Sequence, residues 1–354
     1  MQGFNPHEAR IKTPNPYLTM MGLYLGGFTG MFSETSLNIA LPQLSAAFGV
    51  ETAVMQWMVV GYMLVIGIVL PFASLLMKWF SVRKLTLFAL GAFFVGSVIS
   101  GAAPSFEIML AGRLVQGIGT GLILPMMFAV VLEVFPPVKI GAAMGLTALI
   151  IMFAPAIGPT LSGILLGAFS WRAIFFAFAV VLAVAMVFAA KFLVNPYELT
   201  RPTVDVLSCV LSCLGFGGIV LGAGLASLYG WTSVEVLSAL VIGVVCVAAY
   251  VWRQLHMDTP VLDMRVFAQQ GYRVGVTLVM LNFGITLSAM YLLPQYIQNG
   301  MMLPVAMAGM LMLPGGIVNC IVSVIAGGLY DRIGARIPAR AGFALSIVGA
   351  VMFL

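Results

Sequence analysis

The sequence predicts an all-α polytopic membrane protein, and two observations carry that prediction. The first is composition: 62% of the residues are hydrophobic and 8% are charged, whereas a soluble domain carries roughly 25% charged residues. The second is pattern, because the apolar residues fall into runs of about 20, the length that a helix needs to cross a bilayer. Almost all charged residues lie between these runs or at their ends.

The apolar runs predict ten complete spans. They cover residues 18–40, 54–77, 85–103, 108–131, 142–167, 171–194, 205–227, 234–252, 272–293 and 304–328. An eleventh run begins near residue 341 and is still apolar at Leu354, so we expect an incomplete protein whose sequence stops inside a span. Loops are short nearly everywhere, which excludes an inserted soluble domain.

The basic residues predict the orientation. With the N-terminus in the cytoplasm, 14 of the 16 Lys and Arg residues lie on the cytoplasmic side, as the positive-inside rule requires. Arg172 falls outside and Arg113 lies within the membrane. We therefore expect a protein that spans the cytoplasmic membrane several times, with its N-terminus in the cytoplasm. The net charge of +5 reflects this topology, and no basic soluble segment is long enough to bind nucleic acid.

Similar sequence patterns occur near the two ends of the chain, which predicts an internal repeat. Leu41–Gln43 closes the first span, Leu293–Gln295 closes the ninth, and a basic hairpin follows each one span later. Parallel repeats are typical of transporters, and an offset of eight spans implies six helices, two extra helices and six more. The predicted domains are an N-terminal cytoplasmic segment (1–17), a six-helix half (18–194), two additional helices with their linker (195–252), a cytoplasmic linker (253–271) and the incomplete start of a C-terminal half (272–354).

Two charged residues, Glu34 and Arg113, sit well inside predicted spans. An ionised group in hydrocarbon costs several kcal/mol, so each is a functional-site hypothesis. At ~1.5 Å per residue both lie ~12 Å from the outer boundary, which allows them to meet. Asn38 and Gln116 share a helix face with them. We interpret Asn38 and Gln116 as lining a substrate cavity. The alternative is that they form hydrogen bonds between helices without contacting substrate.

Two segments resemble motifs of the major facilitator superfamily. Gly327–Arg336 resembles its G-x-L-x-D-R-x-G-x-R hairpin, and Leu110–Gly119 resembles its proton-coupling motif around Arg113. The first-half hairpin departs from this pattern, because no Asp or Glu occurs between Thr52 and Phe106. We therefore expect the acidic latch of that hairpin to be absent or differently built there.

Two further segments narrow the resemblance to the fourteen-helix drug:proton antiporters. Ala154–Gly163 resembles the antiporter motif G-x-x-x-G-P-x-x-G-G, with Ala154 and Ser162 in place of two glycines. Glu34–Pro42 resembles a first-helix segment in which Asp is commoner than Glu. Within that family, the sequence is most similar to the lincomycin-resistance-type multidrug exporters of bacteria.

The resemblance implies a major facilitator fold with two six-helix halves and two extra central helices. It implies proton-coupled efflux of lipophilic drugs or antibiotics by alternating access (drug:H+ antiport), driven by the proton gradient without a cofactor. The alternative is a transporter of one specific metabolite on the same fold. The expected partners are small lipophilic substrates, protons and the bilayer; whether the substrates are cationic stays open.

The implied roles fall on four groups of residues. Glu34 and Arg113 would couple protons, Asn38 and Gln116 would line the cavity, and the antiporter motif would seal the fifth span while the halves move. The motif residues are Pro155, Gly158, Pro159 and Gly163, and those of a cytoplasmic gating hairpin are Gly327, Asp331, Arg332, Gly334 and Arg336.

The coupling hypothesis is a competition for one carboxylate. Loss of water favours the neutral form of Glu34, whereas a nearby guanidinium or cationic substrate favours the ionised form, so proton and substrate exclude each other. The alternative is a structural ion pair that braces two helices. An enzyme is not expected, because His7 and His256 lack clustered catalytic partners. Nor is a metal site expected at Cys209 and Cys213, and no phosphate-cradling loop indicates nucleotide binding.

Overall fold

The computed structural model describes residues 13, 15–196, 199–200, 205–257, 260, 262–302 and 305–352, and within them the ordered structure is helical. In chain order the elements are α1 (Pro16–Phe48), α2 (Thr52–Met55), α3 (Trp57–Val69), η1 (Leu70–Phe72), α4 (Ala73–Trp79), α5 (Val82–Ala102), α6 (Phe106–Val134), η2 (Pro137–Lys139), α7 (Ile140–Ala168), α8 (Arg172–Phe192), α9 (Val206–Tyr229), α10 (Val234–His256), η3 (Met264–Ala268), α11 (Gln270–Gln295), η4 (Tyr296–Gly300), α12 (Val305–Ile333) and α13 (Arg336–Met352).

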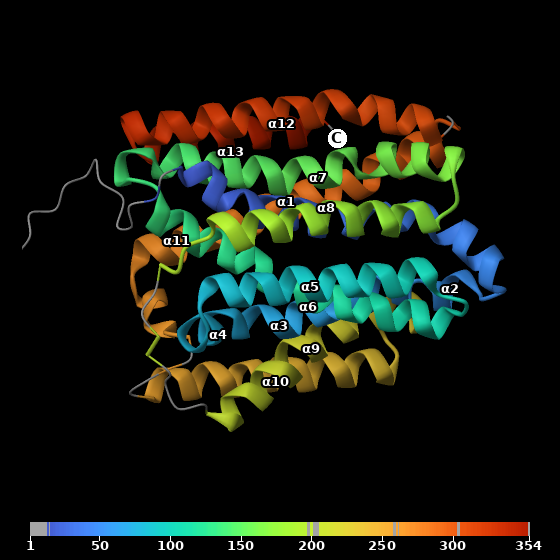
Figure 1. Cartoon of the computed structure of the whole chain (residues 1–354), viewed down its shortest axis with the longest axis horizontal. Helices are drawn as coiled ribbons and strands as arrows, with labels where there is room; N and C mark the ends of the chain where they lie inside the picture. The colour runs from blue at the N-terminus through green and yellow to red at the C-terminus, as the bar shows by residue number, and fades with distance from the viewer. Residues whose placement is uncertain are drawn as a thin grey trace, which may run out of the picture.

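The all-α prediction is confirmed, and each predicted span falls on one helix or on one run of short helices. Within the described part of the chain, eight stretches are long and apolar enough to cross a membrane. Figure 1 shows the long helices lying side by side along the long axis, with α12 at one edge and α10 at the other.

Two spans differ from the apolar pattern at their ends or interior. The first helix continues past Pro42 to Phe48 and stops where Gly49 adopts φ +64°. Glycine adopts this left-handed conformation without strain and so ends the helix. The apolar pattern does not report such a cap. The second span is split into α2, α3, η1 and α4. Its break at Leu70–Phe72 contains Pro71, which lacks the backbone donor that would continue the helix.

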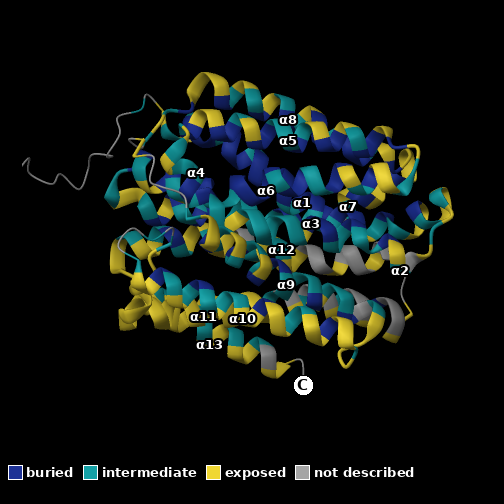
Figure 2. Ribbon diagram, turned by 90° about the horizontal axis from the view of Figure 1, so that it is seen from below, coloured by how far each residue is buried: buried dark blue, intermediate teal, exposed yellow. Residues whose placement is uncertain are grey.

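The best-buried part of the molecule surrounds α1. This helix packs against α6, α7 and α8, while α5 packs against α6 and α8, and α3 against α6. Figure 2 shows the buried residues concentrated in this group, whereas α10, α11 and α13 are largely exposed. The packed centre of the described chain therefore includes the middle of α1, where Glu34 lies, and the first turns of α6, where Arg113 lies.

Two other contacts complete the arrangement. The helix α12 runs along α7, and α9 pairs with α10 while touching α3. On α7 and α12, Gly141 and Gly327 face each other so closely that a Cβ on Gly141 would lie 2.6 Å from the Gly327 carbonyl oxygen. Neither glycine brings a side chain of its own to this crossing, so the two backbones meet directly, beside the side chains of Tyr330 and Asp331.

Candidate functional site

Arg113 is the largest fully buried side chain of the described chain, with no exposed surface. Its Nε donates to the carbonyl oxygen of Met58 on α3 at 3.1 Å. Its Nη1 donates to Ser33 Oγ on α1 and to Gln116 Oε1 on α6, both at 2.6 Å. A guanidinium presents five N–H donors in a fixed fork, and these acceptors, all of them neutral, hold it at the meeting point of three helices.

The ring of Tyr62 lies against the same guanidinium. The Arg113 Cζ is 4.0 Å from the ring centroid, and Tyr62 is itself fully buried. Its hydroxyl lies 3.0 Å from the Gly30 carbonyl oxygen on α1 and 2.7 Å from Thr120 Oγ1 on α6. A cation over an aromatic face is attracted by the ring quadrupole, so Tyr62 adds electrostatic stabilisation that the neutral acceptors alone do not supply.

Gln116 extends the network to a fourth helix. Its Nε2 donates to Ser97 Oγ on α5 at 2.8 Å, and the Ser97 hydroxyl donates to the Phe93 carbonyl oxygen at 2.8 Å. Gln116 and Ser97 have no exposed surface. The buried polar network therefore connects α1, α3, α5 and α6 through direct hydrogen bonds.

Glu34 follows Ser33 on α1 and keeps part of its surface exposed. Among the described residues, Glu34 and Arg113 make no direct ion pair, although the neighbouring Ser33 accepts a hydrogen bond from Arg113. Within the same part of the chain, Arg113 Nη2 is buried and has no hydrogen-bond partner. The guanidinium thus has one unused donor in the same region as a carboxylate.

The second predicted cavity residue of α1 lies outside this network. Asn38 is exposed, and its Nδ2 donates to the Glu34 carbonyl oxygen at 3.5 Å, one turn back along its own helix. Gln116, by contrast, contacts Arg113 directly. The structure therefore brings Arg113 and Gln116 together and places Asn38 beside Glu34 on an open face.

The antiporter-like segment lies within α7, which runs as one helix through it. Gly158 faces Thr35 on α1, where a Cβ would lie 3.3 Å from Thr35 Cβ and closer still to its hydroxyl oxygen. Pro155 is buried, and Gly163 is exposed with open space beside it. The side chain of Pro159 lies outside the described residues. Gly158 is thus the motif residue that lets α7 approach the Glu34 region closely.

The hairpin that follows α12 contacts the start of α7. The two carboxylate oxygens of Asp331 accept from the backbone N–H groups of Gly141 at 2.7 Å and Ala142 at 2.8 Å. The first N–H groups of a helix have no partner within it, and the positive end of the helix dipole favours an anion there. Arg332, Gly334 and Arg336 are exposed, and Gly334 makes the turn with φ +76°.

The first-half hairpin, which has no acidic residue, is held differently. The Val82 backbone N–H donates to Asn195 Oδ1 at 2.8 Å, and Arg83 Nε donates to the Leu193 carbonyl oxygen at 2.6 Å. Both acceptors directly follow α8. This hairpin is therefore fastened to the helix before the extra pair, whereas Asp331 joins α12 to α7.

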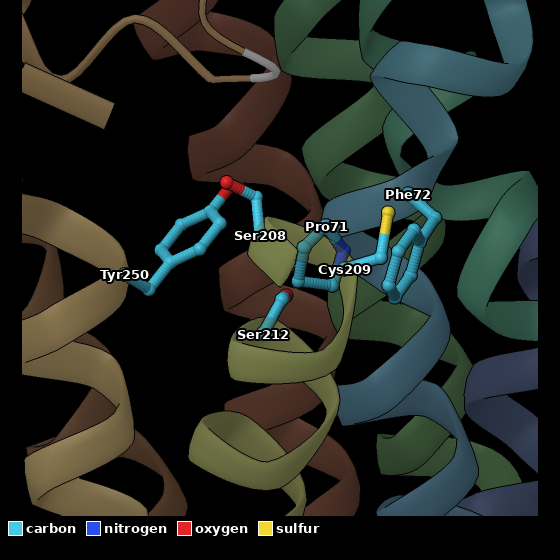
Figure 3. Close-up of a pocket in the computed structure, with 6 residues that line it drawn as sticks. All are labelled: Pro71, Phe72, Ser208, Cys209, Ser212 and Tyr250. Atoms are coloured by element: carbon cyan, nitrogen blue, oxygen red, sulfur yellow. The ribbon is translucent and has the colours of Figure 1, made fainter. Parts of the chain in front are cut away.

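A separate narrow pocket, with no room for a water molecule, lies between the extra helices and the α3–α4 junction. Figure 3 shows its lining residues, Pro71, Phe72, Ser208, Cys209, Ser212 and Tyr250. None of them belongs to the Arg113 network. Beside this pocket, at the start of α9, Asp205 receives two hydrogen bonds from Arg253, at 2.7 and 3.0 Å, which join α9 to α10.

Reasoning from the sequence missed four members of the network: Ser33, Tyr62, Ser97 and Thr120. One signal was available, because Thr120 lies seven residues after Arg113 and so shares its helix face. The contacts of Ser33, Tyr62 and Ser97 come from other helices, and no spacing within one helix reveals them.

Comparisons with known proteins identify the family of the chain. The sequence profile described as Major Facilitator Superfamily matches residues 23–206 and 204–354. The chain is 41% identical over 339 residues to the lincomycin resistance protein LmrB of Listeria monocytogenes, covering 96% of this chain and 72% of that protein. It is 44% identical to LmrB of Bacillus subtilis, covering 93% and 69%.

A more distant relative is the multidrug resistance protein Stp of Mycobacterium tuberculosis, at 27% identity over 95% of this chain and 63% of that protein. Among solved structures, the proton:xylose symporter XylE of the same superfamily aligns with a TM-score of 0.58 at 14% identity, covering 90% of this chain and 70% of that one. The peptide transporter POT in complex with sulfate aligns at 0.57 and 14%, covering 84% and 65%. At these identities the two structures support the fold alone.

Proposed function

This chain belongs to the major facilitator superfamily, and we propose that it exports lipophilic drugs or antibiotics from bacteria in exchange for protons. The names of the LmrB and Stp relatives favour drug export over transport of a single metabolite. The observation that carries the coupling scheme is the buried Arg113, which keeps one unused donor near the carboxylate of Glu34.

In the proposed cycle, Glu34 carries the proton and Arg113 tunes it. When the cavity is wet or holds a cationic substrate, the ionised carboxylate is stabilised and Arg113 Nη2 is its available donor. When the cavity is closed and drier, the neutral carboxyl is favoured, because loss of water penalises the ionised form. Proton and substrate then occupy the site in alternation, and this alternation couples their movements in opposite directions.

The other predicted residues have supporting roles in this cycle. Asn38 offers an exposed amide next to Glu34 and would contact substrate, while the fully buried Gln116 would hold Arg113 in place. Gly158 keeps α7 against α1 beside Glu34. Asp331 would close one state of the cycle by binding the first turn of α7, and breaking that contact would open it.

The proposed setting is the cytoplasmic membrane of a bacterium. The N-terminus would lie inside, because this orientation puts most Lys and Arg residues on the cytoplasmic side. The hairpin at Asp331 would then face the cytoplasm and Gly49 the outside. Lipophilic substrates would enter from the membrane or the cytoplasm when that side is open.

Substrate-driven proton movement in proteoliposomes tests the proposal. The protein is reconstituted into vesicles that enclose a pH-sensitive dye. A panel of candidate substrates, both dyes and antibiotics, is then added outside. We expect lincosamide-type and lipophilic compounds to trigger proton release in the wild type and none in Glu34→Gln. Glu51→Gln, an exposed acid just after α1, is the control. Undiminished release by Glu34→Gln would eliminate Glu34 as the carrier.

A further inference from the structure

We propose that Tyr62 is a positioning residue for Arg113, and that its ring and hydroxyl together keep the guanidinium where Nη2 remains available to Glu34. This inference rests on the proposed function, in which Arg113 acts on the proton of Glu34. Its support is geometric and comes from three sets of contacts made by one turn of α3, from Met58 to Tyr62.

The first contact is the ring itself. Arg113 is fully buried, and its three hydrogen-bond acceptors carry no charge. The Tyr62 ring, 4.0 Å from Cζ, is therefore the π surface that partly balances a desolvated cation. Removing it would weaken the hold on the guanidinium without touching any of the three hydrogen bonds.

The second contact fixes the ring in place. A phenol has one hydrogen, and the Gly30 carbonyl oxygen can only accept, so Tyr62 donates to Gly30 and accepts from Thr120. These bonds tie the ring tip to α1 and α6 together. Gly30 is needed for this approach, since a Cβ there would lie 2.8 Å from Thr120 Cγ2.

The third contact comes from the same face of α3. Met58 precedes Tyr62 by one helical turn, and its carbonyl oxygen accepts from Arg113 Nε. One turn of α3 therefore holds the guanidinium at two points, through a backbone acceptor at Nε and through a ring over Cζ. Because Nη1 donates to Ser33 and Gln116, Nη2 is the guanidinium nitrogen that these contacts leave without an acceptor.

Few other charges reach this region. Among the described residues of α2, α3, α6, α7 and α8, which pack on α1, the groups near its middle are Tyr62 and Arg113. The remaining titratable groups of these helices lie at their ends: Glu107, Glu133, Arg172 and Lys191. A change in the protonation of Glu34 on altering Tyr62 would therefore act through Arg113.

The test measures the reaction of Glu34 with a carbodiimide, which attacks the protonated carboxyl, across pH, with the modified peptide quantified by mass spectrometry. Tyr62→Leu removes ring and hydroxyl, Tyr62→Met fills the space without a ring, and Tyr62→Phe keeps the ring alone. Tyr250→Leu removes an equally buried ring on α10 and is the matched control. Arg113→Gln is combined with Tyr62→Leu to test whether the two residues act together.

We expect Tyr62→Leu and Tyr62→Met to shift the pH midpoint of labelling in the same direction as Arg113→Gln. We expect Tyr62→Phe, which keeps the ring but loses the bonds to Gly30 and Thr120, to give a smaller shift in the same direction, and Tyr250→Leu to leave the profile unchanged. In the double variant, Tyr62→Leu adds no further shift. Substrate-driven proton movement should fall about 30-fold in Tyr62→Leu, which corresponds to the ~2 kcal/mol of a desolvated cation–π contact.

An unshifted profile in both Tyr62→Leu and Tyr62→Met, or a full additional shift in the Arg113→Gln background, overturns the positioning role. The labelling requires no transport, so it separates this inference from the function it rests on. Shifted labelling in a protein whose wild type moves no protons would retain the role of Tyr62 and remove the antiport proposal.

Discussion

Asp331, at the end of α12, accepts a hydrogen bond from the backbone N–H of Gly141 at the start of α7, 190 residues earlier in the chain. The second carboxylate oxygen takes the next N–H, so one side chain serves two donors that their own helix leaves unpaired. This is a charge-assisted helix cap supplied from a distant helix, and it predicts how the α7–α12 contact responds to the loss of one charge.

Replacing Asp331 by Asn removes the negative charge and one of the two acceptors. Hydrogen bonds to charged groups contribute about 1.5–3 kcal/mol, so we expect amide hydrogen exchange in the first turn of α7 to accelerate about tenfold or more. Hydrogen exchange with mass spectrometry of the peptide around Gly141 measures this. Glu235→Gln, an exposed acid at the start of α10, should leave that peptide unchanged.

The first-half hairpin should respond locally. Asn195→Ala removes the acceptor of the Val82 N–H, and we expect a loss of about 1 kcal/mol, with faster exchange in the first turn of α5. Asn195→Asp keeps the acceptor and serves as the control. Accelerated exchange at Gly141 in Asn195→Ala would contradict the separation of the two hairpins.

Adding a side chain at Gly158 should separate α7 from α1. Gly158→Ala places a methyl group against Thr35, and overpacking of this kind costs about 1–3 kcal/mol. We expect a lower thermal midpoint in detergent and reduced substrate-driven proton movement. Gly167→Ala on the same helix, where a Cβ meets nothing within 4 Å, is the control, and an equal loss there would contradict the steric explanation.

The bond between α9 and α10 should be sensitive to acid. The Arg253 hydrogen bonds, followed by that of Ser208, lower the pKa of Asp205 from its ordinary 3.8 to about 2. Because the folded pKa is the lower one, the stabilisation is complete above pH 3.8 and is lost as the pH falls toward about 2.

Thermal unfolding of wild type and Asp205→Asn across pH measures this effect. We expect a difference in midpoint that stays constant from pH 7 down to the ordinary pKa of the carboxyl, 3.8, and shrinks toward pH 2. A difference that is unchanged at the lowest pH would show that the charge of Asp205 contributes nothing to the joint.

The sequence supported the fold well because apolar run length reports membrane helices almost directly. It predicted the position of every described span, and its errors fell at Pro42 and Pro71, where backbone chemistry decides the outcome. The spacing of Arg113 and Gln116 correctly placed them on one face, and they are hydrogen bonded at 2.6 Å.

The partners contributed by other helices could not be predicted, since packing angle and helix rotation decide them. Tyr62 looked like one more aromatic residue in an apolar run until α3 was placed against α6. Arg172 is a similar case. Its position outside the expected charge pattern had no explanation, and the structure shows its Nη2 donating to the Ala103 carbonyl oxygen at 3.2 Å, with its Cζ 4.2 Å from the Trp171 ring.

The glycine crossing of α7 and α12 has a consequence for the passage of water between these two helices. Where Gly141 meets Gly327, and Gly145 meets the Ser323 carbonyl oxygen, main chain touches main chain. A file of water molecules needs a wider passage than such a seam leaves, and protons hop only along connected water. At these two glycines the seam between α7 and α12 is therefore too narrow for connected water, and we expect no proton leak along it.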